Sequence, residues 1–377
     1  MIRNKKTFNP LSPRKNLEAD KFRRDFRSAK IKKKNLRSFN VGIAGYGIVG
    51  KRRRFFIDQH PNLKVTAVCD QKFHNSGVMS DGVKYHPNYK KLLKEDIDII
   101  FISFPNYLAS EATIAGLNRK LHVFCEKPPG RTVKDIEDVI KIKKKHPGLI
   151  LKYGFNHRYH NSVKQALSIV KSRKLGDVIN IRGVYGKSKI IPFSGGWRAE
   201  RKYAGGGILL DQGIHMVDLM CLFCGEFVEV KSFVSNNYWK HDVEDNAYAL
   251  LKDRKGRIAM LHSSATQWQH CFSLEISLTN GFLELQGILS GSKSYGEEKL
   301  IVGKRDERDM GNSKEEIITY LDDNSWKEEI DEFAQALVNK KPIKSGTYED
   351  ALTTMKLVYK IYHADPVWRK AFKIKKP

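Results

Sequence analysis

The chain of 377 residues is poor in cysteine, and we find in it no apolar run that approaches the length of a membrane span. Its five cysteines are an odd number in a long chain, which argues against a disulfide framework and favours a reducing compartment. The N-terminus lacks the apolar core of a secretory signal. These absences predict a cytoplasmic protein with no membrane partner.

Acidic residues are scarce relative to basic ones. The chain has 42 Asp and Glu against 68 Lys and Arg, so the formal net charge is +26. Residues 1–38 hold 14 Lys or Arg against 3 Asp or Glu, which predicts a basic N-terminal arm. The basic surface could serve a polyanion or an anionic substrate such as a nucleotide sugar, or it could simply be solvated. No nucleic-acid motif or aromatic platform accompanies the charge, which disfavours a nucleic-acid partner.

A metal site is not predicted. Cys221 and Cys224 form a C-x-x-C pair inside the apolar helical pattern 214–223, and no second pair accompanies them. Buried thiols are therefore the preferred interpretation over a zinc site.

A glycine fingerprint is the first motif that carries chemistry. Gly45, Gly47 and Gly50 close an apolar run and open a helix-compatible stretch, and Asp70 follows 20 positions after the last glycine. The glycines permit a tight turn, close approach to a pyrophosphate and helix–strand packing. The pattern predicts a dinucleotide rather than an ordinary glycine-rich turn. Asp70 favours NAD because it would bind the ribose diol and repel a 2′-phosphate, although Lys72 keeps NADP possible.

Strand and helix patterns alternate up to residue 154, which predicts a doubly wound parallel sheet. Apolar runs at 246–251, 258–264, 272–278 and 282–285 are separated by turn signals and predict antiparallel hairpins. Helical patterns follow at 326–338 and 348–363. We expect four parts: a basic arm (1–38), a dinucleotide-binding domain (39–155), a second domain (156–345), and a C-terminal helix and tail (346–377).

Lys127 stands in a Glu-Lys-Pro-Pro segment where the fifth strand of the sheet should end. Ligands of open α/β sheets bind outside the carboxyl ends of the strands, so Lys127 would point toward the nicotinamide end of a cofactor. A lysine there can stabilise a developing alkoxide, whereas the plain alternative is a lysine in an exposed loop.

Asp211, His215 and Asp218 follow a run of three glycines, Gly205 to Gly207. The spacing of four places Asp211 and His215 on one helix face, with Asp218 on a neighbouring row. A neutral histidine suits a general base, and an aspartate beside it can fix its tautomer. Metal binding is the weaker alternative, because no third ligand stands at a suitable spacing.

These three motifs, in this order and at these intervals, resemble the glucose–fructose oxidoreductase, inositol dehydrogenase and rhizopine-catabolism (Gfo/Idh/MocA) family over about residues 39–365. The resemblance implies an α/β fold with an N-terminal Rossmann domain. It also implies a C-terminal α/β domain built on a large, mostly antiparallel open sheet that commonly mediates oligomerisation. One departure is Ala109, which stands where many members have a histidine.

The resemblance also implies the site residues. Its catalytic set is Lys127, Asp211 and His215, with His215 as the proton acceptor. The implied cofactor contacts are Gly45, Tyr46, Gly47, Ile48, Val49, Asp70, Pro105, Asn106, Glu126 and Lys127. The implied substrate contacts are Asn156, Arg158, Trp197, Arg198 and Asp211, and a structural salt bridge is the alternative for the arginines.

We therefore hypothesise an NAD(P)-dependent oxidoreductase that moves hydride between nicotinamide and a carbinol carbon of a sugar, nucleotide sugar or cyclitol. We expect it to act as a homo-oligomer, a dimer or a tetramer. Two alternatives remain: a glycoside hydrolase that recycles bound NAD, and a non-catalytic protein that senses a dinucleotide or binds a polyanion.

Overall fold

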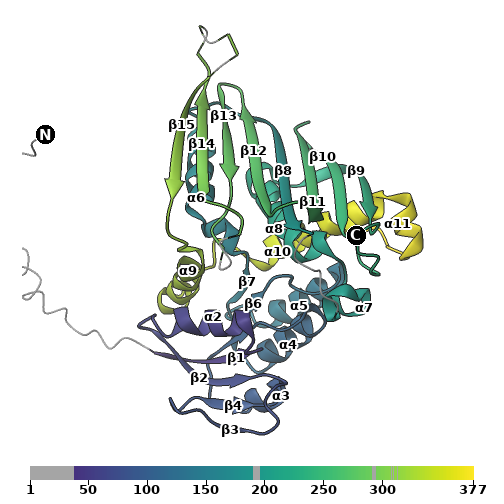
Figure 1. Ribbon diagram of the computed structural model, residues 1–377. Helices are drawn as coiled ribbons and strands as arrows, with labels where there is room; N and C mark the ends of the chain where they lie inside the picture. Colours follow the sequence, from purple (N-terminus) through teal and green to yellow (C-terminus); the bar gives the residue numbers. More distant parts are fainter. Residues whose placement is uncertain (1–37, 190–195, 291–293, 307, 309, 312) are drawn as a thin grey trace, which may run out of the picture. The chain divides into compact units, whose positions relative to one another are not determined.

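The computed structural model describes residues 38–189, 196–290, 294–306, 308, 310–311 and 313–377. The expected basic arm therefore lies outside the described residues, apart from Ser38. Residues Ser38–Pro377 form one compact unit that contains two β-sheets with helices between and around them (Figure 1).

The first sheet has seven strands in the order β3-β4-β2-β1-β5-β6-β7, and only the β3–β4 pair is antiparallel among its described strands. The strand order reverses at β1, and open α/β sheets bind ligands at such a point. The predicted doubly wound parallel sheet is confirmed. The strands are β1 (Phe39–Ala44), β2 (Leu63–Cys69), β3 (Gly77–Val78), β4 (Lys84–His86), β5 (Ile99–Ile102), β6 (His122–Glu126) and β7 (Leu151–Gly154).

Helices cover both faces of this sheet because alternate strand residues point to opposite sides. Ile100 and Ile102 belong to a core that also includes residues of α4 and α5, whereas Phe101 lies in a second core with residues of α2 and α9. Thr132 and Asp135 form a capping box that begins α5. The helices of this part are α2 (Ile48–Ile57), α3 (Tyr89–Leu92), α4 (Asn106–Asn118) and α5 (Val133–Lys145).

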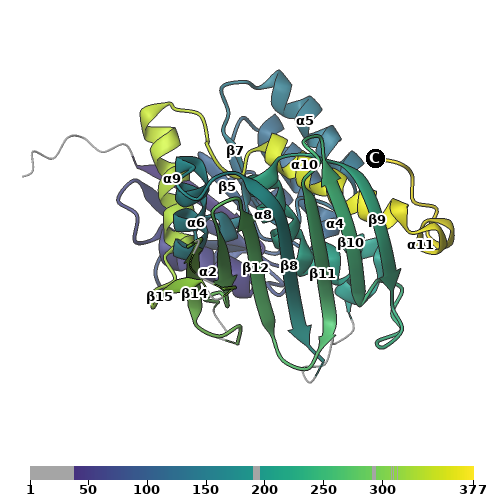
Figure 2. The same ribbon diagram turned by 90° about the horizontal axis from the view of Figure 1, so that it is seen from above.

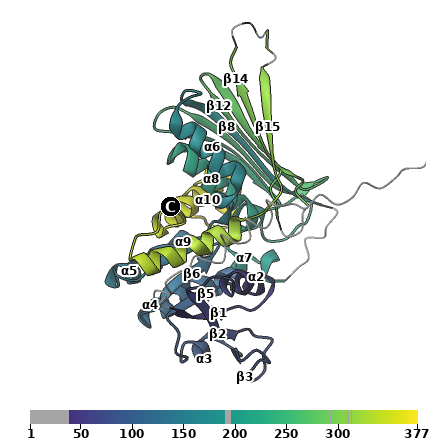
Figure 3. The same ribbon diagram turned by 90° about the vertical axis from the view of Figure 1, so that its left-hand side faces the viewer.

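Helix α9 (Ser325–Asn339) packs on the first sheet, although the expected boundaries assign it to the second domain. The Phe333 ring meets the rings of Phe101 and Phe124 edge-on, with both centroid separations 5.6 Å. The chain thus returns to the dinucleotide-binding half after the second sheet is complete. Figure 3 shows α9 beside α2 and the first sheet.

The second sheet has eight strands in the order β15-β14-β13-β12-β8-β11-β10-β9. Its described pairs are antiparallel except β8–β11, which is parallel. The predicted hairpins β10–β11 and β12–β13 are confirmed. The strands are β8 (Val178–Ser188), β9 (Phe227–Ser235), β10 (Asn246–Asp253), β11 (Ile258–Gln267), β12 (Cys271–Leu278), β13 (Gly281–Gln286), β14 (Glu298–Lys304) and β15 (Lys314–Tyr320).

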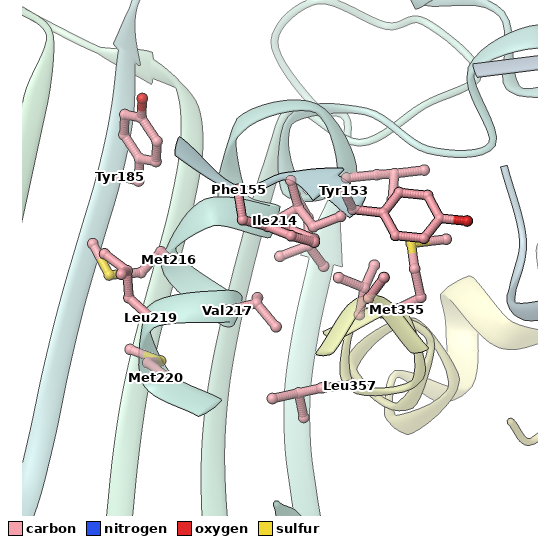
Figure 4. Close-up of a cluster of buried hydrophobic side chains, with 14 of the residues drawn as sticks. Tyr153, Phe155, Tyr185, Ile214, Met216, Val217, Leu219, Met220, Met355 and Leu357 are labelled. Atoms are coloured by element: carbon pink, nitrogen blue, oxygen red, sulfur yellow. The ribbon is translucent and has the colours of Figure 1, made fainter. Parts of the chain in front are cut away.

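Among the residues that the structure describes, helices cover only one face of the second sheet (Figures 2 and 3). Met216 and Met220 of α8 pack toward the strands, and Met355 and Leu357 of α10 lie in the same buried cluster (Figure 4). The remaining helices and turns are η1 (Asn156–Tyr159), α6 (Asn161–Ser172), η2 (Trp197–Ala199), α7 (Arg201–Ala204), η3 (Leu209–Gly213), α8 (Ile214–Cys224), α10 (Tyr348–Ala364) and α11 (Pro366–Ala371).

The helical stretch Arg201–Cys224 corrects the expectation that no apolar run approaches the length of a membrane span. Over the described residues it alone is long and apolar enough to cross a membrane, with a hydropathy of 1.4 in its 18-residue window. However, 78% of that window is buried inside the molecule, as in the core helix of a globular protein. The apolarity therefore follows from packing between the second sheet and α10.

The two cysteines of the C-x-x-C pair, Cys221 and Cys224, lie on α8. All five cysteines are free thiols, and Cys224 is buried while Cys221 is partly buried. Burial raises the pKa of Cys224 to about 11 and also raises that of Cys221, so both favour the protonated form.

Candidate active site

A cavity of about 710 Å³ lies where the carboxyl ends of the first sheet meet the second domain. Gly47 and Asp70 line it from the first domain, and Trp197, Asp211 and His215 line it from the second. Residues from the three predicted motifs therefore share one space. A cavity of this volume is large enough for a cofactor and a small substrate.

The glycine turn has the shape that a dinucleotide requires. Gly45 has φ +93°, and a Cβ there would lie 2.6 Å from the Ser103 carbonyl oxygen. A Cβ at Gly50 would lie 2.0 Å from the Gly45 oxygen, so both positions exclude a side chain. Gly47 faces open space and begins α2 without a side-chain cap. The unpaired N–H groups of the first turn are thus available to an anion, which fits a pyrophosphate.

Asp70 lies directly after β2 at the rim of the cavity. One carboxylate oxygen accepts a 2.9 Å bond from the Tyr46 backbone N–H, and the other accepts a 3.0 Å bond from that of Lys72. These two bonds fix the carboxylate while each oxygen retains a lone pair for a ribose hydroxyl. The Tyr46 side chain, by contrast, is not among the residues that line the cavity; its hydroxyl accepts from Arg54.

Lys127 follows β6 immediately, and the Lys127–Pro128 peptide bond is cis. The Lys127 Nζ donates a 2.6 Å hydrogen bond to the backbone oxygen of Asp211 and lies 3.9 Å from its carboxylate. Burial lowers the pKa of Lys127, while the charges of Asp211 and Glu126 raise it. The ammonium group therefore bridges the two domains at the cavity wall.

Asp211 and His215 lie at the junction of a π-turn and an α-helix. This corrects the expectation that both residues stand on one face of a single helix. Asp211 belongs to the π-turn η3, and His215 is the second residue of α8. Single π-turns inside helices are frequent at functional sites. Despite the changed spacing, both side chains line the cavity.

The His215 imidazole is buried and stacks on the His157 ring, with centroids 3.7 Å apart and planes 11° apart. Burial, followed by the charges of His157 and Lys127, lowers the pKa of His215 well below its usual value. Its Nδ1 is buried and has no hydrogen-bond partner among the described residues. The neutral ring is thus able to accept a proton from a ligand at Nε2.

Trp197 and Arg198 lie on the short turn η2 and line the cavity as expected. The Arg198 guanidinium lies 4.3 Å from the centre of the Trp197 ring and 3.8 Å from the Asp211 carboxylate. The Arg198 side chain is 52% exposed, so it is accessible to a ligand.

Asn156 also lines the cavity, and its amide donates a 3.1 Å bond to the Ser325 hydroxyl. Its neighbour His157 lines the cavity too, with Nε2 3.2 Å from the Tyr185 hydroxyl. His157 was not predicted, although the segment around it was recognised. No feature of the sequence around His157 predicts that its ring stacks on the ring of His215.

Arg158 does not reach the cavity, so its expected substrate contact is not supported. Its guanidinium is buried and forms a bidentate ion pair with Asp218, with bonds of 2.7 and 2.6 Å. It also donates a 2.8 Å bond to Asp350 at the start of α10. Arg158 and Asp218 therefore tie η1, α8 and α10 together, which is the structural salt bridge that the sequence left open.

The remaining expected cofactor residues lie at the cavity. Val49, Pro105, Asn106 and Glu126 line it, as does Ile48, which is 82% exposed. The Asn106 amide donates a 2.7 Å bond to the Ala204 carbonyl oxygen of the second domain, and Glu126 accepts a 2.6 Å bond from Arg53. Asn106 and Glu126 thus also have structural roles.

Several lining residues were missed. Tyr89, Tyr107, Leu289, Arg52 and Trp326 line the cavity, and none belongs to a predicted set. Arg52 had a usable signal, because it stands four residues after Ile48 on the helix that follows the fingerprint. No sequence signal pointed to Trp326, because its position depends on the packing of α9 against α2.

The chain matches two models of one family. The model described as "Oxidoreductase family, NAD-binding Rossmann fold" (GFO_IDH_MocA) matches residues 39–155, and that of the Gfo/Idh/MocA C-terminal domain matches residues 163–284. A solved structure of levoglucosan dehydrogenase in complex with NADH has a TM-score of 0.75 and 17% identity. The match covers 88% of this chain and 98% of the levoglucosan dehydrogenase chain. At 17% identity it supports the fold alone.

Relatives with named activities are similar to only part of this chain. The 2,7-anhydro-N-acetylneuraminate hydratase of Escherichia coli K12 is 24% identical over 65% of this chain and 67% of its own length. The 1,5-anhydro-D-fructose reductase of Ensifer adhaerens is 28% identical over 50% of this chain and 56% of its own length. The match thus spans little more than half of the second relative. Two family models that together span residues 39–284, with one short gap, place this chain in the Gfo/Idh/MocA oxidoreductase family, with an NAD-binding Rossmann domain.

Proposed function

We propose that this oxidoreductase acts on a secondary alcohol of a sugar, sugar derivative or cyclitol. The observation that carries the proposal is the convergence of Lys127 from the first domain with Asp211 and His215 from the second in one cavity. The names of the relatives, an anhydrosugar reductase, an anhydrosugar hydratase and a levoglucosan dehydrogenase, favour a carbohydrate.

Each of the three side chains has a role that its surroundings support. His215, neutral and buried, accepts the hydroxyl proton of the substrate at Nε2. Lys127 stabilises the negative charge that develops on the same oxygen, and its bond to the Asp211 backbone fixes the ammonium group. The Asp211 carboxylate lies between Lys127 and Arg198, where it can accept a bond from a second substrate hydroxyl.

Bound NAD would supply the hydride acceptor, and His215 would take the hydroxyl proton as the carbinol carbon loses its hydride and becomes a ketone carbon. Gly47 and the start of α2 would hold the pyrophosphate, and Asp70 would hold the ribose diol. Lys72 also lines the cavity beside Asp70, so use of NADP is part of the proposal.

The proposal is tested by absorbance at the NADH band across free polyols, aldoses, uronates, anhydrosugars and UDP-sugars, with NAD and NADP in separate series. We expect at least one compound to reduce NAD stoichiometrically. Turnover of a glycoside without net NADH would instead favour the hydrolase that recycles its cofactor. Binding of NAD with no turnover of any class would favour a sensor.

We further propose that the uncovered face of the second sheet binds a second copy of the chain. Phe233 and Tyr248 face each other across β9 and β10, and neighbouring apolar side chains extend the patch. A patch of this kind on a sheet usually marks an interface. Its exposed members, all on β9, β10 and β11, are Phe233 (79%), Tyr248 (50%), Leu250 (54%), Ile258 (43%) and Met260 (43%).

The double substitution Phe233→Glu and Leu250→Glu is expected to convert the oligomer to a monomer, because it removes two exposed apolar side chains of the patch and would place four carboxylates in each dimer interface. Light scattering after size exclusion measures the mass. Val78→Glu is the matched control, since Val78 is 63% exposed on β3 of the first sheet. An unchanged mass of the double variant would contradict this interface.

A further inference from the structure

Three consecutive arginines on α2 differ in their partners. Arg53 is buried and bonded to Glu126 and Glu329, with distances of 2.6 and 2.7 Å. Arg54 is paired with Asp58 and Asp81. For Arg52, by contrast, no carboxylate of the described residues lies within ion-pair distance. Its cation lies 5.0 Å from the centre of the Trp326 ring, which the Arg53 cation also contacts at 4.3 Å.

Arg52 also differs from its neighbours in where it points. It stands one helical turn after Ile48, and both side chains line the cavity, whereas Arg53 and Arg54 do not. Trp326 of α9 lines the cavity beside it. A guanidinium is always charged and carries five donors, so an unpaired one in a binding cavity calls for an anion.

The surroundings of Arg52 identify that anion. Gly47 begins α2 without a side-chain cap, and the first turn of α2 contains no acidic residue. The free N–H groups and the partial positive charge of this helix end therefore lie one turn from the Arg52 guanidinium. A pyrophosphate has enough oxygens to accept hydrogen bonds from the helix N–H groups and from the Arg52 guanidinium. Arginine binds phosphate oxygens in a bidentate manner.

We propose that Arg52 is a further binding residue for the pyrophosphate of the dinucleotide, and that Trp326 positions its guanidinium. The indole ring holds the cation in place without neutralising it, so its charge remains free for the phosphate oxygens. The Rossmann domain thus has a cationic side chain in addition to the backbone groups of its glycine turn. This role concerns the cofactor alone and is independent of which alcohol is oxidised.

The test compares the affinities of the whole chain for NADH, ADP-ribose and adenosine, measured by calorimetry. Arg52→Gln is expected to weaken NADH and ADP-ribose about tenfold and to leave adenosine, which lacks phosphates, unchanged. Lys51→Gln removes the same charge from the adjacent position, which is exposed and does not line the cavity, and should change none of the three affinities. Arg52→Lys should give an intermediate loss, because it keeps the charge without the fork of donors.

Three results would overturn the proposal. One is an Arg52→Gln variant that binds NADH and ADP-ribose as tightly as the unmodified chain. Another is an equal loss for adenosine, which would place the effect outside the pyrophosphate. The third is an equal loss in Lys51→Gln, which would reduce Arg52 to a contribution to net charge. Unchanged thermal unfolding of both variants shows that the fold is intact in this comparison.

Discussion

Replacing Lys127 by alanine is expected to lower turnover by about a thousandfold while leaving the affinity for NADH within about twofold. Lys127 acts on charge that exists only in the transition state, so its loss affects the rate of the chemical step much more than ground-state binding. Its position supports this role, because the Nζ is held at 2.6 Å from the Asp211 backbone oxygen. Steady-state kinetics with the substrate found in the screen measures the rate, and NADH fluorescence measures the affinity.

Lys141→Ala serves as the control for Lys127→Ala. Lys141 is 69% exposed on α5 and pairs only with Asp138 among the described residues, so its loss should change neither quantity. Thermal unfolding of the Lys127 variant checks that loss of the bond to Asp211 has not separated the domains. Turnover within a few-fold of the unmodified enzyme would remove Lys127 from the catalytic set.

Replacing His215 by asparagine is expected to lower alcohol oxidation by about a thousandfold and to abolish its dependence on pH at the acid side. A base must be unprotonated to act, so activity falls as the pH drops through its pKa. Burial and the neighbouring charges lower the pKa of His215 well below 6.5. The acid limb of kcat/KM for the unmodified enzyme should therefore have its midpoint below pH 6.5.

His157→Gln provides a second variant for the same assignment. The charge of His157 contributes to the lowered pKa of His215, so its removal should raise that pKa and move the midpoint of the acid limb to higher pH. The measurement is kcat/KM across the range in which the fold, followed by circular dichroism, is stable. An acid limb that persists unchanged in His215→Asn would identify another group as the base.

The fingerprint and the end of β6 could be predicted because their geometry is local. A glycine at position 50 is required by an atom only five residues away, the Gly45 oxygen, and the sequence carries that requirement directly. Lys127 likewise follows β6 with no intervening residue, and the end of a parallel strand sets its direction. The order of the motifs was then enough to indicate the family.

The Asp211 to His215 segment could be predicted only in part. A spacing of four implies one face of an α-helix, but the π-turn η3 changes that relation, and backbone bonding outside the segment decides which helix type forms. Glu244, for example, accepts hydrogen bonds from the backbone N–H groups of Gly207 and Leu209 from 35 or more residues away. The strands β9 and β15 were also missed, because their polar residues reflect a sheet with one uncovered face, and β14 was missed although Leu300, Ile301 and Val302 form a buried apolar run.

The dinucleotide turn, the parallel sheet and the position of Lys127 follow from local sequence, since each depends on backbone sterics or on periodicity within a few residues. The pairing of Arg158 with Asp218, the stacking of His157 on His215 and the contact of Trp326 with Arg52 arise from the fold as a whole. These contacts join residues 60, 58 and 274 positions apart, and packing of whole elements, not local preference, selects them.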